Sequence, residues 1–431
     1  MLIEHFLRLG AYAAGGSFAM SVFIVLSQRW HGKLSHDCDL SSVQKVHLNA
    51  VPRIGGLAVI GGMVAALLIF SHYFPGLLDE SRQGKIALLL LVSVPAFFAG
   101  IIEDLTKTVS VKLRLSATLF SALLASYTLG ATVQELDIWG VDRLLVLTPV
   151  AVVVTALVVA GGANAINIID GFNGLSSSVL ILMAGGLSVV AWQTDCTLVV
   201  ALGVLCIGAT LGFLALNYPC GRLFLGDGGA YLLGFLVAEM AVLLLVRRPE
   251  VNAWQVLSIC AYPIIEIMFS IYRRKFIRNV SPGAPDALHL HTLVYRRLVF
   301  ARLQHDRQRP WKRNAAVACV IVPVVAVFVT ASALAGARPA AAMLLVALQV
   351  SVYLLCYRRL VHGRWLRRAA PAGRRAVESM REPSLPPKIL PAGQASAGMA
   401  SVTALVPKSE ASSALKRAEA AALFEPERQM R

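Results

Sequence analysis

Long apolar runs recur along this chain and restrict what it can fold into more than any other feature. Eleven of them, each about 17 to 23 residues long, lie between residues 6 and 357. A helix of that length crosses a hydrocarbon core of roughly 30 Å. Lipid-facing backbone must satisfy its own hydrogen bonds, and the runs lack the alternation of barrel strands, so helices are the only conformation that fits.

The sequence therefore predicts an all-α, polytopic integral membrane protein with about eleven transmembrane helices. The composition agrees, because 57% hydrophobic residues, 15% charged residues and a mean hydropathy of +0.68 exclude an ordinary water-soluble globule. The first run is long for a secretory signal, and we expect it to remain as a membrane anchor. The expected spans are 6–27, 54–74, 85–102, 113–131, 144–163, 176–193, 197–216, 230–246, 253–272, 314–336 and 339–357.

The distribution of Lys and Arg predicts the orientation of the chain. With these spans, 33 of the 40 Lys and Arg residues fall on one side, in alternate connections and in the tail. The positive-inside rule makes that side cytoplasmic and puts the N-terminus outside. The tail, residues 358–431, is rich in Ala, Pro, Ser and Arg, which predicts a disordered cytoplasmic extension. No nucleic-acid motif accompanies the net charge of +16, so no nucleic-acid partner is expected.

Five polar segments stand out, and all of them fall on the predicted cytoplasmic side. Within the spans, only Glu239 and Glu266 are clear ionisable exceptions, whereas an ion-coupled transporter usually carries its carboxylates near the midplane. The pattern therefore favours chemistry at the membrane surface. The segments are QKVHLNAVPRIGG (44–56), GIIEDLTKTVSVKLR (100–114), NAINIIDGFNGL (164–175), NYPCGRLFLGDGGA (217–230) and SPGAPDALHLHTLVYRR (281–297).

Four carboxylates lie in these segments: Glu103, Asp104, Asp170 and Asp227. Brought together, they would repel one another unless a cation lay between them. Hard oxygen ligands without thiolates suit Mg²⁺, or Mn²⁺ as the alternative. Any one of these carboxylates alone is equally well explained as the end of a span. Their recurrence on one face favours a divalent metal site.

Cationic, imidazole and amide side chains accompany the acidic set, as a phosphate-bearing substrate requires. Asn164, Asn167, Asp170 and Asn173 follow one another at i, i+3 steps, so neighbours meet on a helix and can bind a heterocycle or sugar without added charge. Membrane topology and helix capping are the competing explanations. The cationic and imidazole candidates are Arg53, Lys107, Arg114, Arg222, His289 and His291.

Taken in order, the five segments resemble those of the polyprenyl-phosphate N-acetylhexosamine-1-phosphate transferase superfamily, over roughly residues 37–300. NAINIIDGFNGL and FLGDGG carry the most specific match. The resemblance implies transfer of a sugar-1-phosphate, with N-acetylhexosamine expected, from a UDP-sugar to undecaprenyl or another polyprenyl phosphate. UMP would be released, Mg²⁺ would be required, and the reaction would initiate cell-envelope polysaccharide synthesis at the bacterial inner membrane. Residues 1–357 would then be the catalytic transmembrane domain, with its active-site loops in the cytoplasm.

The resemblance also implies roles for individual residues. Asp227 matches the metal-binding aspartate of the Gly-Asp turn, with Asp104 as a second metal contact. Glu103 and Asp104 occupy the acidic pair, and Asp170 joins them as a catalytic candidate. The substrate-binding set is expected to comprise Lys45, His47, Arg53, Lys107, Arg114, Asn164, Asn167, Asn173, Arg222, His289 and His291.

Three departures from the superfamily's pattern matter. Glu103 replaces the usual aspartate, Ala230 stands where a serine is usual, and Leu290 and Thr292 interrupt the histidine run, which points away from the muramoyl-pentapeptide enzyme. That enzyme class, and a non-catalytic transporter or lipid-binding scaffold, remain the alternatives. Direct transfer and a double displacement through Asp104 or Asp170 are both open. The sequence leaves the sugar, the pathway and the oligomeric state, including a homodimer, undecided.

Overall fold

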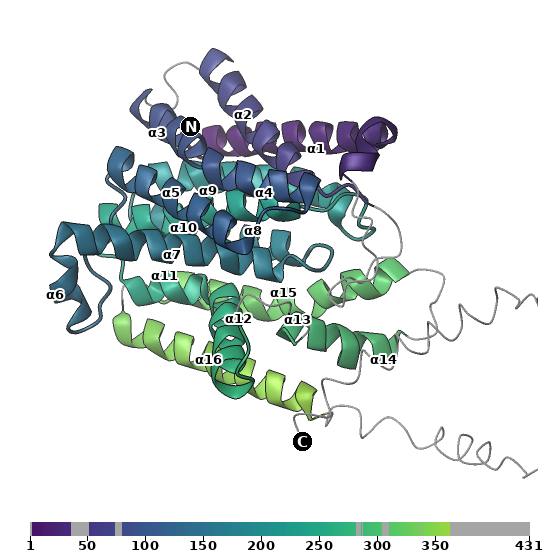
Figure 1. Cartoon of the computed structure of the whole chain (residues 1–431). Coiled ribbons are helices and arrows are strands. Elements are labelled where there is room, and N and C mark those ends of the chain that lie inside the picture. The colour runs from purple at the N-terminus through teal and green to yellow at the C-terminus, as the bar shows by residue number, and fades with distance from the viewer. Residues whose placement is uncertain are drawn as a thin grey trace, which may run out of the picture. The chain divides into compact units, whose positions relative to one another are not determined.

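The computed structural model describes residues 2–35, 51–73, 80–281, 286, 288–303, 310–336 and 338–362. Within this part, helices form nearly all of the regular structure, which confirms the predicted all-α class (Figure 1). The expectations for Lys45, His47 and the tail beyond residue 362 fall outside the described residues.

The first half of the chain forms α1 (Leu2–Ser35), α2 (Gly55–Tyr73), α3 (Glu80–Val92), α4 (Val94–Thr106), α5 (Val111–Leu129), α6 (Val141–Leu145), α7 (Thr148–Ile169) and α8 (Leu175–Gln193). The second half forms α9 (Thr197–Asn217), α10 (Gly226–Arg247), α11 (Ala253–Ile259), α12 (Ala261–Tyr272), α13 (Leu290–Leu293), α14 (Phe300–Arg302), α15 (Pro310–Leu334) and α16 (Pro339–Val361). Two π-helical turns, Arg273–Ile277 and Val294–Val299, continue α12 and α13.

In the described residues, nine helices are long and apolar enough to cross a membrane, and the bent pair α11–α12 makes a tenth. This is a multi-pass membrane protein, with one span fewer than the eleven expected. The difference lies at 113–131, where α5 forms a helix but does not pass the same test of hydropathy. Lys112, Arg114 and several Ser and Thr residues of α5 account for its lower hydropathy.

The expected span at 253–272 corresponds to two helical segments, because the helix breaks at Cys260. The segments on the two sides of the break are bent by 84° relative to each other, and α12 stands across its neighbours in Figure 1. Pro263 explains the break, since a proline ring clashes with the carbonyl four residues earlier, which here belongs to Ile259 at the end of α11. Sequence hydropathy does not register this effect.

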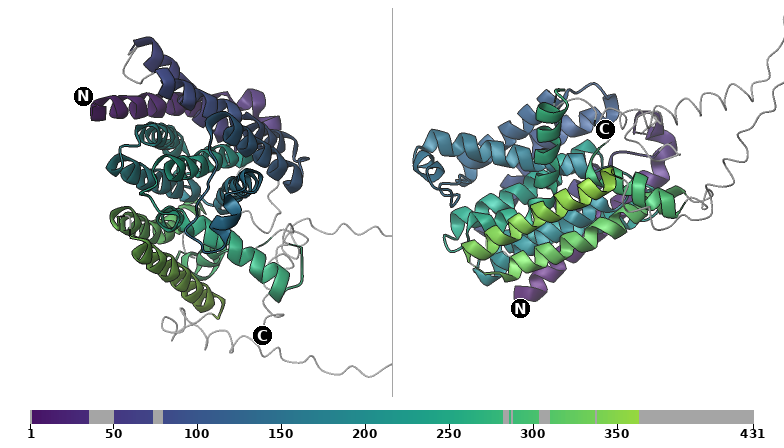
Figure 2. Two further views of the ribbon diagram at one scale, coloured as in Figure 1. Left: turned by 90° about the vertical axis from the view of Figure 1, so that its left-hand side faces the viewer. Right: turned by 90° about the horizontal axis from the view of Figure 1, so that it is seen from below.

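Helix α10 lies at the centre of the bundle and contacts α2, α4, α5, α7, α8 and α9. Its most apolar stretch is 78% buried within the protein, against 22% for that of α16. The left panel of Figure 2 looks along many of the helices and shows α1 and α2 at one edge, with α15 and α16 at the opposite edge. The N-terminal turn of α10 is therefore surrounded by other helix ends.

Glycines let two helices close on that first turn. A Cβ atom at Gly100 of α4 would lie 2.5 Å from the Cα atom of Gly228, and one at Gly56 of α2 would collide with the backbone of Gly229. Small residues at such contacts allow backbones to approach directly. The start of α10, which carries Asp227, is thus held between α2 and α4.

Candidate active site

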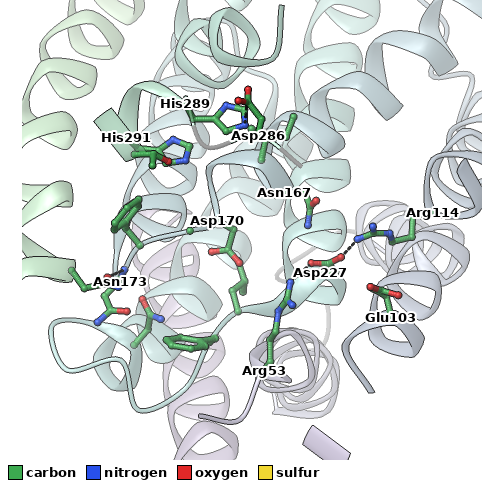
Figure 3. Close-up of a pocket in the computed structure, with 18 residues that line it drawn as sticks. Arg53, Glu103, Arg114, Asn167, Asp170, Asn173, Asp227, Asp286, His289 and His291 are labelled. Carbon is green, nitrogen blue, oxygen red and sulfur yellow. Dashed lines mark hydrogen bonds and ion pairs between the residues drawn. The ribbon is translucent and has the colours of Figure 1, made fainter. Parts of the chain in front are cut away.

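One pocket collects side chains from all five polar segments, as the sequence predicts (Figure 3). It has a volume of about 360 Å³. It lies where the C-terminal ends of α4 and α7 meet the N-terminal ends of α5 and α10. Among the predicted residues, those lining it are Arg53, Glu103, Arg114, Asn167, Asp170, Asn173, Asp227, His289 and His291.

Asp227 is held between two guanidinium groups. Its Oδ1 atom lies 2.5 Å from Nη2 of Arg53, and its Oδ2 atom forms an ion pair with Arg114. The carboxylate is 6% exposed, whereas the side chains of Arg53 and Arg114 are 25% and 12% exposed. The arginines therefore stand between the buried carboxylate and the open pocket, where a phosphate can reach them.

Asp104 lies behind Asp227 and caps α10. Its side chain is fully buried, and its two oxygens accept the backbone N–H groups of Asp227 and Gly228, each at 2.9 Å. A carboxylate at this position satisfies donors that a helix N-terminus otherwise leaves unpaired and complements the helix dipole. Arg53 Nε lies 3.3 Å from the same carboxylate. Both oxygens of Asp104 are therefore already engaged in placing Asp227.

The loop after α7 is fixed by two asparagines that the sequence analysis missed. Asn217 Oδ1 accepts the N–H group of Gly174 at 2.7 Å, and Asn314 Oδ1 accepts that of Asn173 at 2.6 Å. Both asparagines are buried and line the pocket. Asn217 is the first residue of the fourth polar segment, and this position could have identified it as a site residue. Asn314 lies at the start of an apolar run, where only its own polarity distinguishes it.

His289 and His291 stack on each other at the entrance to α13. Their rings are 5.3 Å apart with an interplanar angle of 6°. Glu266 of α12 lies beneath them, with its Oε1 atom 3.0 Å from Nδ1 of His289. Phe172 packs edge-on against His291 at 5.6 Å. The prediction that these histidines lie in a loop is confirmed for His289, which precedes α13, and is wrong for His291, which lies within α13.

Comparisons with known proteins identify the family of the chain. The profile of glycosyl transferase family 4 matches residues 86–245, a stretch that includes Glu103, Asp170 and Asp227. A Bacillus subtilis protein named probable undecaprenyl-phosphate N-acetylglucosaminyl 1-phosphate transferase is 30% identical over 258 residues, which are 59% of this chain and 68% of that protein. The chain belongs to glycosyl transferase family 4.

Two other relatives of this family 4 protein are informative. An undecaprenyl-phosphate alpha-N-acetylglucosaminyl 1-phosphate transferase of Yersinia pestis is 27% identical over 270 residues, covering 60% of this chain and 69% of that protein. A phospho-N-acetylmuramoyl-pentapeptide-transferase of Geobacillus kaustophilus is 31% identical over 205 residues, covering 45% and 61%. The family of polyprenyl-phosphate sugar-1-phosphate transferases is therefore established, whereas the sugar is not.

Three of the described residues predicted to bind substrate do not line the pocket of this family 4 protein. Asn164 accepts the Tyr231 hydroxyl at 3.0 Å inside the bundle. The side chains of Lys107 and Arg222 are exposed beside the pocket. Lys107 ends α4 with a φ of 56°, and its N–H group bonds the carbonyl of Glu103 at 2.8 Å. Substrate contact by these three residues stays a prediction.

The chemistry of the pocket fits Mg²⁺ held jointly with a substrate. Four carboxylates line it, those of Glu103, Asp170, Asp227 and Asp286, against the two guanidinium groups. A diphosphate would add further negative charge, which a divalent cation would offset. Among the described residues no three His, Cys, Asp or Glu side chains form a ready metal cluster. Mg²⁺ commonly takes only one or two carboxylates and completes its shell with phosphate and water.

Asp170 and His291 are two of the pocket's ionisable groups with shifted pKa values. Burial raises the pKa of Asp170 from 3.8 to about 6, although the Ser176 hydroxyl and Arg53 partly oppose this. Burial lowers the pKa of His291 to about 4. Asp170 is therefore mostly ionised and His291 neutral near pH 7. Ionised Asp170 destabilises the folded protein, because the Asp170 carboxyl group binds a proton more tightly in the folded protein than in the unfolded chain.

Asp170→Asn is accordingly expected to stabilise the substrate-free protein while impairing transfer. The destabilisation caused by ionised Asp170 develops as pH rises from about 4 to about 6 and is complete above that window. The asparagine keeps an acceptor for the Ser176 hydroxyl, which lies 2.5 Å from Asp170 Oδ1. The melting temperature in detergent should exceed that of the wild type by roughly 2–6 °C at pH 8. The difference should vanish near pH 4; a constant difference across this range would contradict the assignment.

Proposed function

We propose that this family 4 protein transfers N-acetylhexosamine-1-phosphate from a UDP-sugar to undecaprenyl phosphate and releases UMP. The observation that carries the proposal is the pair of arginines on Asp227, in a pocket whose other walls are the Asn167–Asn173 segment and the two histidines. The relatives from Bacillus subtilis and Yersinia pestis carry names with that acceptor and N-acetylglucosamine. Such a reaction would begin the assembly of a cell-envelope polysaccharide.

The proposed reaction depends more on positioning the two substrates and neutralising their phosphate charges than on a general base. The acceptor is a phosphate monoester with a second pKa of about 6, so it is mostly a dianion near pH 7. Its oxygen attacks the sugar-bound phosphorus, the bond to the other phosphate breaks, and UMP leaves with the electron pair. In this proposal Arg53, Arg114 and the histidines hold the phosphates in line, while Asn167 and Asn173 hold the nucleotide end.

The proposed cofactor is Mg²⁺, with Mn²⁺ as the substitute. Asp227 would hold it, and Glu103 is the better placed second carboxylate, because Glu103 and Asp227 line the pocket whereas Asp104 does not. When bound, the cation would neutralise charge on the diphosphate. Asp104 would then act by positioning Asp227 rather than as a ligand.

A double displacement is the rival mechanism. Asp104 is a poor nucleophile in this arrangement because it is buried and fully hydrogen-bonded, so Asp170 is the remaining candidate. Exchange of labelled UMP into the UDP-sugar without lipid acceptor would favour the rival. Absence of exchange, with transfer intact, would favour direct attack.

The positive-inside bias orients the proposed site toward the cytoplasm, with the N-terminus outside. Both substrates suit that position, since UDP-sugars are soluble and the acceptor phosphate lies at the membrane surface. A bacterial inner membrane is the expected location, and the oligomeric state remains open.

We expect membranes containing this protein to transfer label from UDP-N-acetylglucosamine, or from another UDP-N-acetylhexosamine, to undecaprenyl phosphate. The assay would use a panel of radiolabelled UDP-sugars with Mg²⁺, and EDTA should remove the activity, which Mg²⁺ or Mn²⁺ should restore. UDP-N-acetylmuramoyl-pentapeptide belongs in the panel as the alternative donor. Transfer from UDP-N-acetylmuramoyl-pentapeptide alone would reject the proposed N-acetylhexosamine donor. Transfer from no donor would support the transporter or scaffold alternative.

A further inference from the structure

Glu266 is the one carboxylate within a predicted span that contacts the pocket's histidines. It lies on α12 and is 1% exposed. Its Oε1 atom is 3.0 Å from Nδ1 of His289 and also 3.0 Å from the backbone nitrogen of Leu290. Its Oε2 atom has no hydrogen-bond partner among the described residues and lies 4.0 Å from Nδ1 of His291. One buried carboxylate thus faces both imidazoles.

The chemistry of this contact fixes the protonation pattern of His289. A carboxylate oxygen can only accept a hydrogen bond, so Nδ1 of His289 must carry the proton. The remaining nitrogen, Nε2, is then the one available to a ligand in the pocket, which His289 lines. Nε2 lies 3.7 Å from Asp286 Oδ2, a separation too long for a direct hydrogen bond. Carboxylates that orient a functional imidazole in this way are common in metal and catalytic sites.

The surroundings hold Glu266 and the histidine segment in fixed relation. Arg273, which directly follows α12, donates to the carbonyl of Leu288 and to the Tyr357 hydroxyl, each at 2.5 Å, and pairs with Asp286. The segment that carries His289 is therefore tied to both α12 and α16. The break at Cys260 bends α12 by 84° relative to α11. In this orientation Glu266 of α12 contacts the segment that carries His289.

We propose that Glu266 is a positioning residue that sets the tautomer and orientation of His289, and through it the phosphate-facing nitrogen of the site. This inference deepens the proposed function and rests on it for its kinetic consequence. It also gives a role to Glu266, one of the two clear ionisable residues inside the predicted spans. Glu239 in α10, by contrast, is fully buried, makes no side-chain hydrogen bond within the part of the chain that the structure describes, and does not line the pocket, which makes it the matched control.

The kinetic test is a double-mutant cycle. Glu266→Ala should lower kcat about 10- to 100-fold with the KM for the UDP-sugar within about 3-fold of wild type. Glu266→Gln, which keeps an acceptor oxygen for Nδ1, should recover much of that loss. Because Glu266 acts through His289, adding Glu266→Ala to His289→Ala should reduce activity no further. Glu239→Gln should be indistinguishable from wild type.

A spectroscopic arm separates this inference from the proposed function. In ¹⁵N-histidine-labelled protein, the signal that disappears in His289→Ala identifies His289, and its shifts should report a proton on Nδ1. Glu266→Ala should abolish that pattern, while Glu239→Gln should leave it. Lack of transfer in the wild type would count against the proposed function alone. An unchanged His289 tautomer in Glu266→Ala would overturn the role of Glu266. So would an equal loss of activity on adding Glu266→Ala to the wild type and to His289→Ala.

Discussion

Asp227→Asn is expected to lower sugar-phosphate transfer by at least about 100-fold while the protein stays folded. The substitution keeps the shape of the side chain but removes the charge that holds Arg53 and Arg114. Loss of one preorganised electrostatic contact in an active site typically lowers the rate by about 10²- to 10³-fold. In the proposed mechanism the same change also removes the principal metal ligand. Transfer of labelled sugar phosphate to undecaprenyl phosphate would measure the loss.

The fold should survive this change because the two arginines are partly exposed to the pocket and can be hydrated there. Melting temperature and yield in detergent would verify that. Asp195→Asn is the matched control, since Asp195 lies in the exposed connection between α8 and α9, away from the pocket. Activity of Asp227→Asn above a tenth of wild type would reject the assigned role.

Gly100→Ala is expected to have the second largest effect, although Gly100 touches no substrate. Its new Cβ would lie 2.5 Å from both N and Cα of Gly228, and backbone atoms cannot move aside as flexible side chains do. Helix α4 would have to separate from α10, which pulls Asp104 from the N–H groups that it caps. We expect at least about a 10-fold loss of transfer and a lower melting temperature, because overpacking of this kind costs roughly 1–3 kcal/mol.

Gly161→Ala in α7 is the control for this substitution. A Cβ atom there would meet nothing within 4 Å, and alanine is the better helix former. Its activity and melting temperature should match or slightly exceed those of the wild type. Equal behaviour of the two variants would mean that the close approach of α4 and α10 does not position the site.

Much of the site was predictable because polarity is conspicuous in a membrane protein. The acidic, amide and basic residues of the five connections are easy to recognise beside apolar spans. Nine of the predicted residues line one pocket. Asn314 and Asn217 were not predicted, and Glu266 was noted only as an ionisable exception within a span, each for a local reason. Asn314 and Glu266 lie in apolar runs where one polar residue has no pattern around it, and Asn217 ends a span as many asparagines do. Their partners are 141, 43 and 23 residues away in sequence.

The sequence by itself determined the all-α class, the approximate spans and the grouping of polar segments at one end of the helices. Hydropathy and charge act residue by residue against the lipid, so they can be read from the chain alone. Only the tertiary structure decided that the span around Cys260 is bent, that Asp104 caps α10 instead of facing the pocket, and that Glu266 lies under His289. These depend on which helix ends meet and how closely, and that is set by the packing of glycines and by contacts between distant segments.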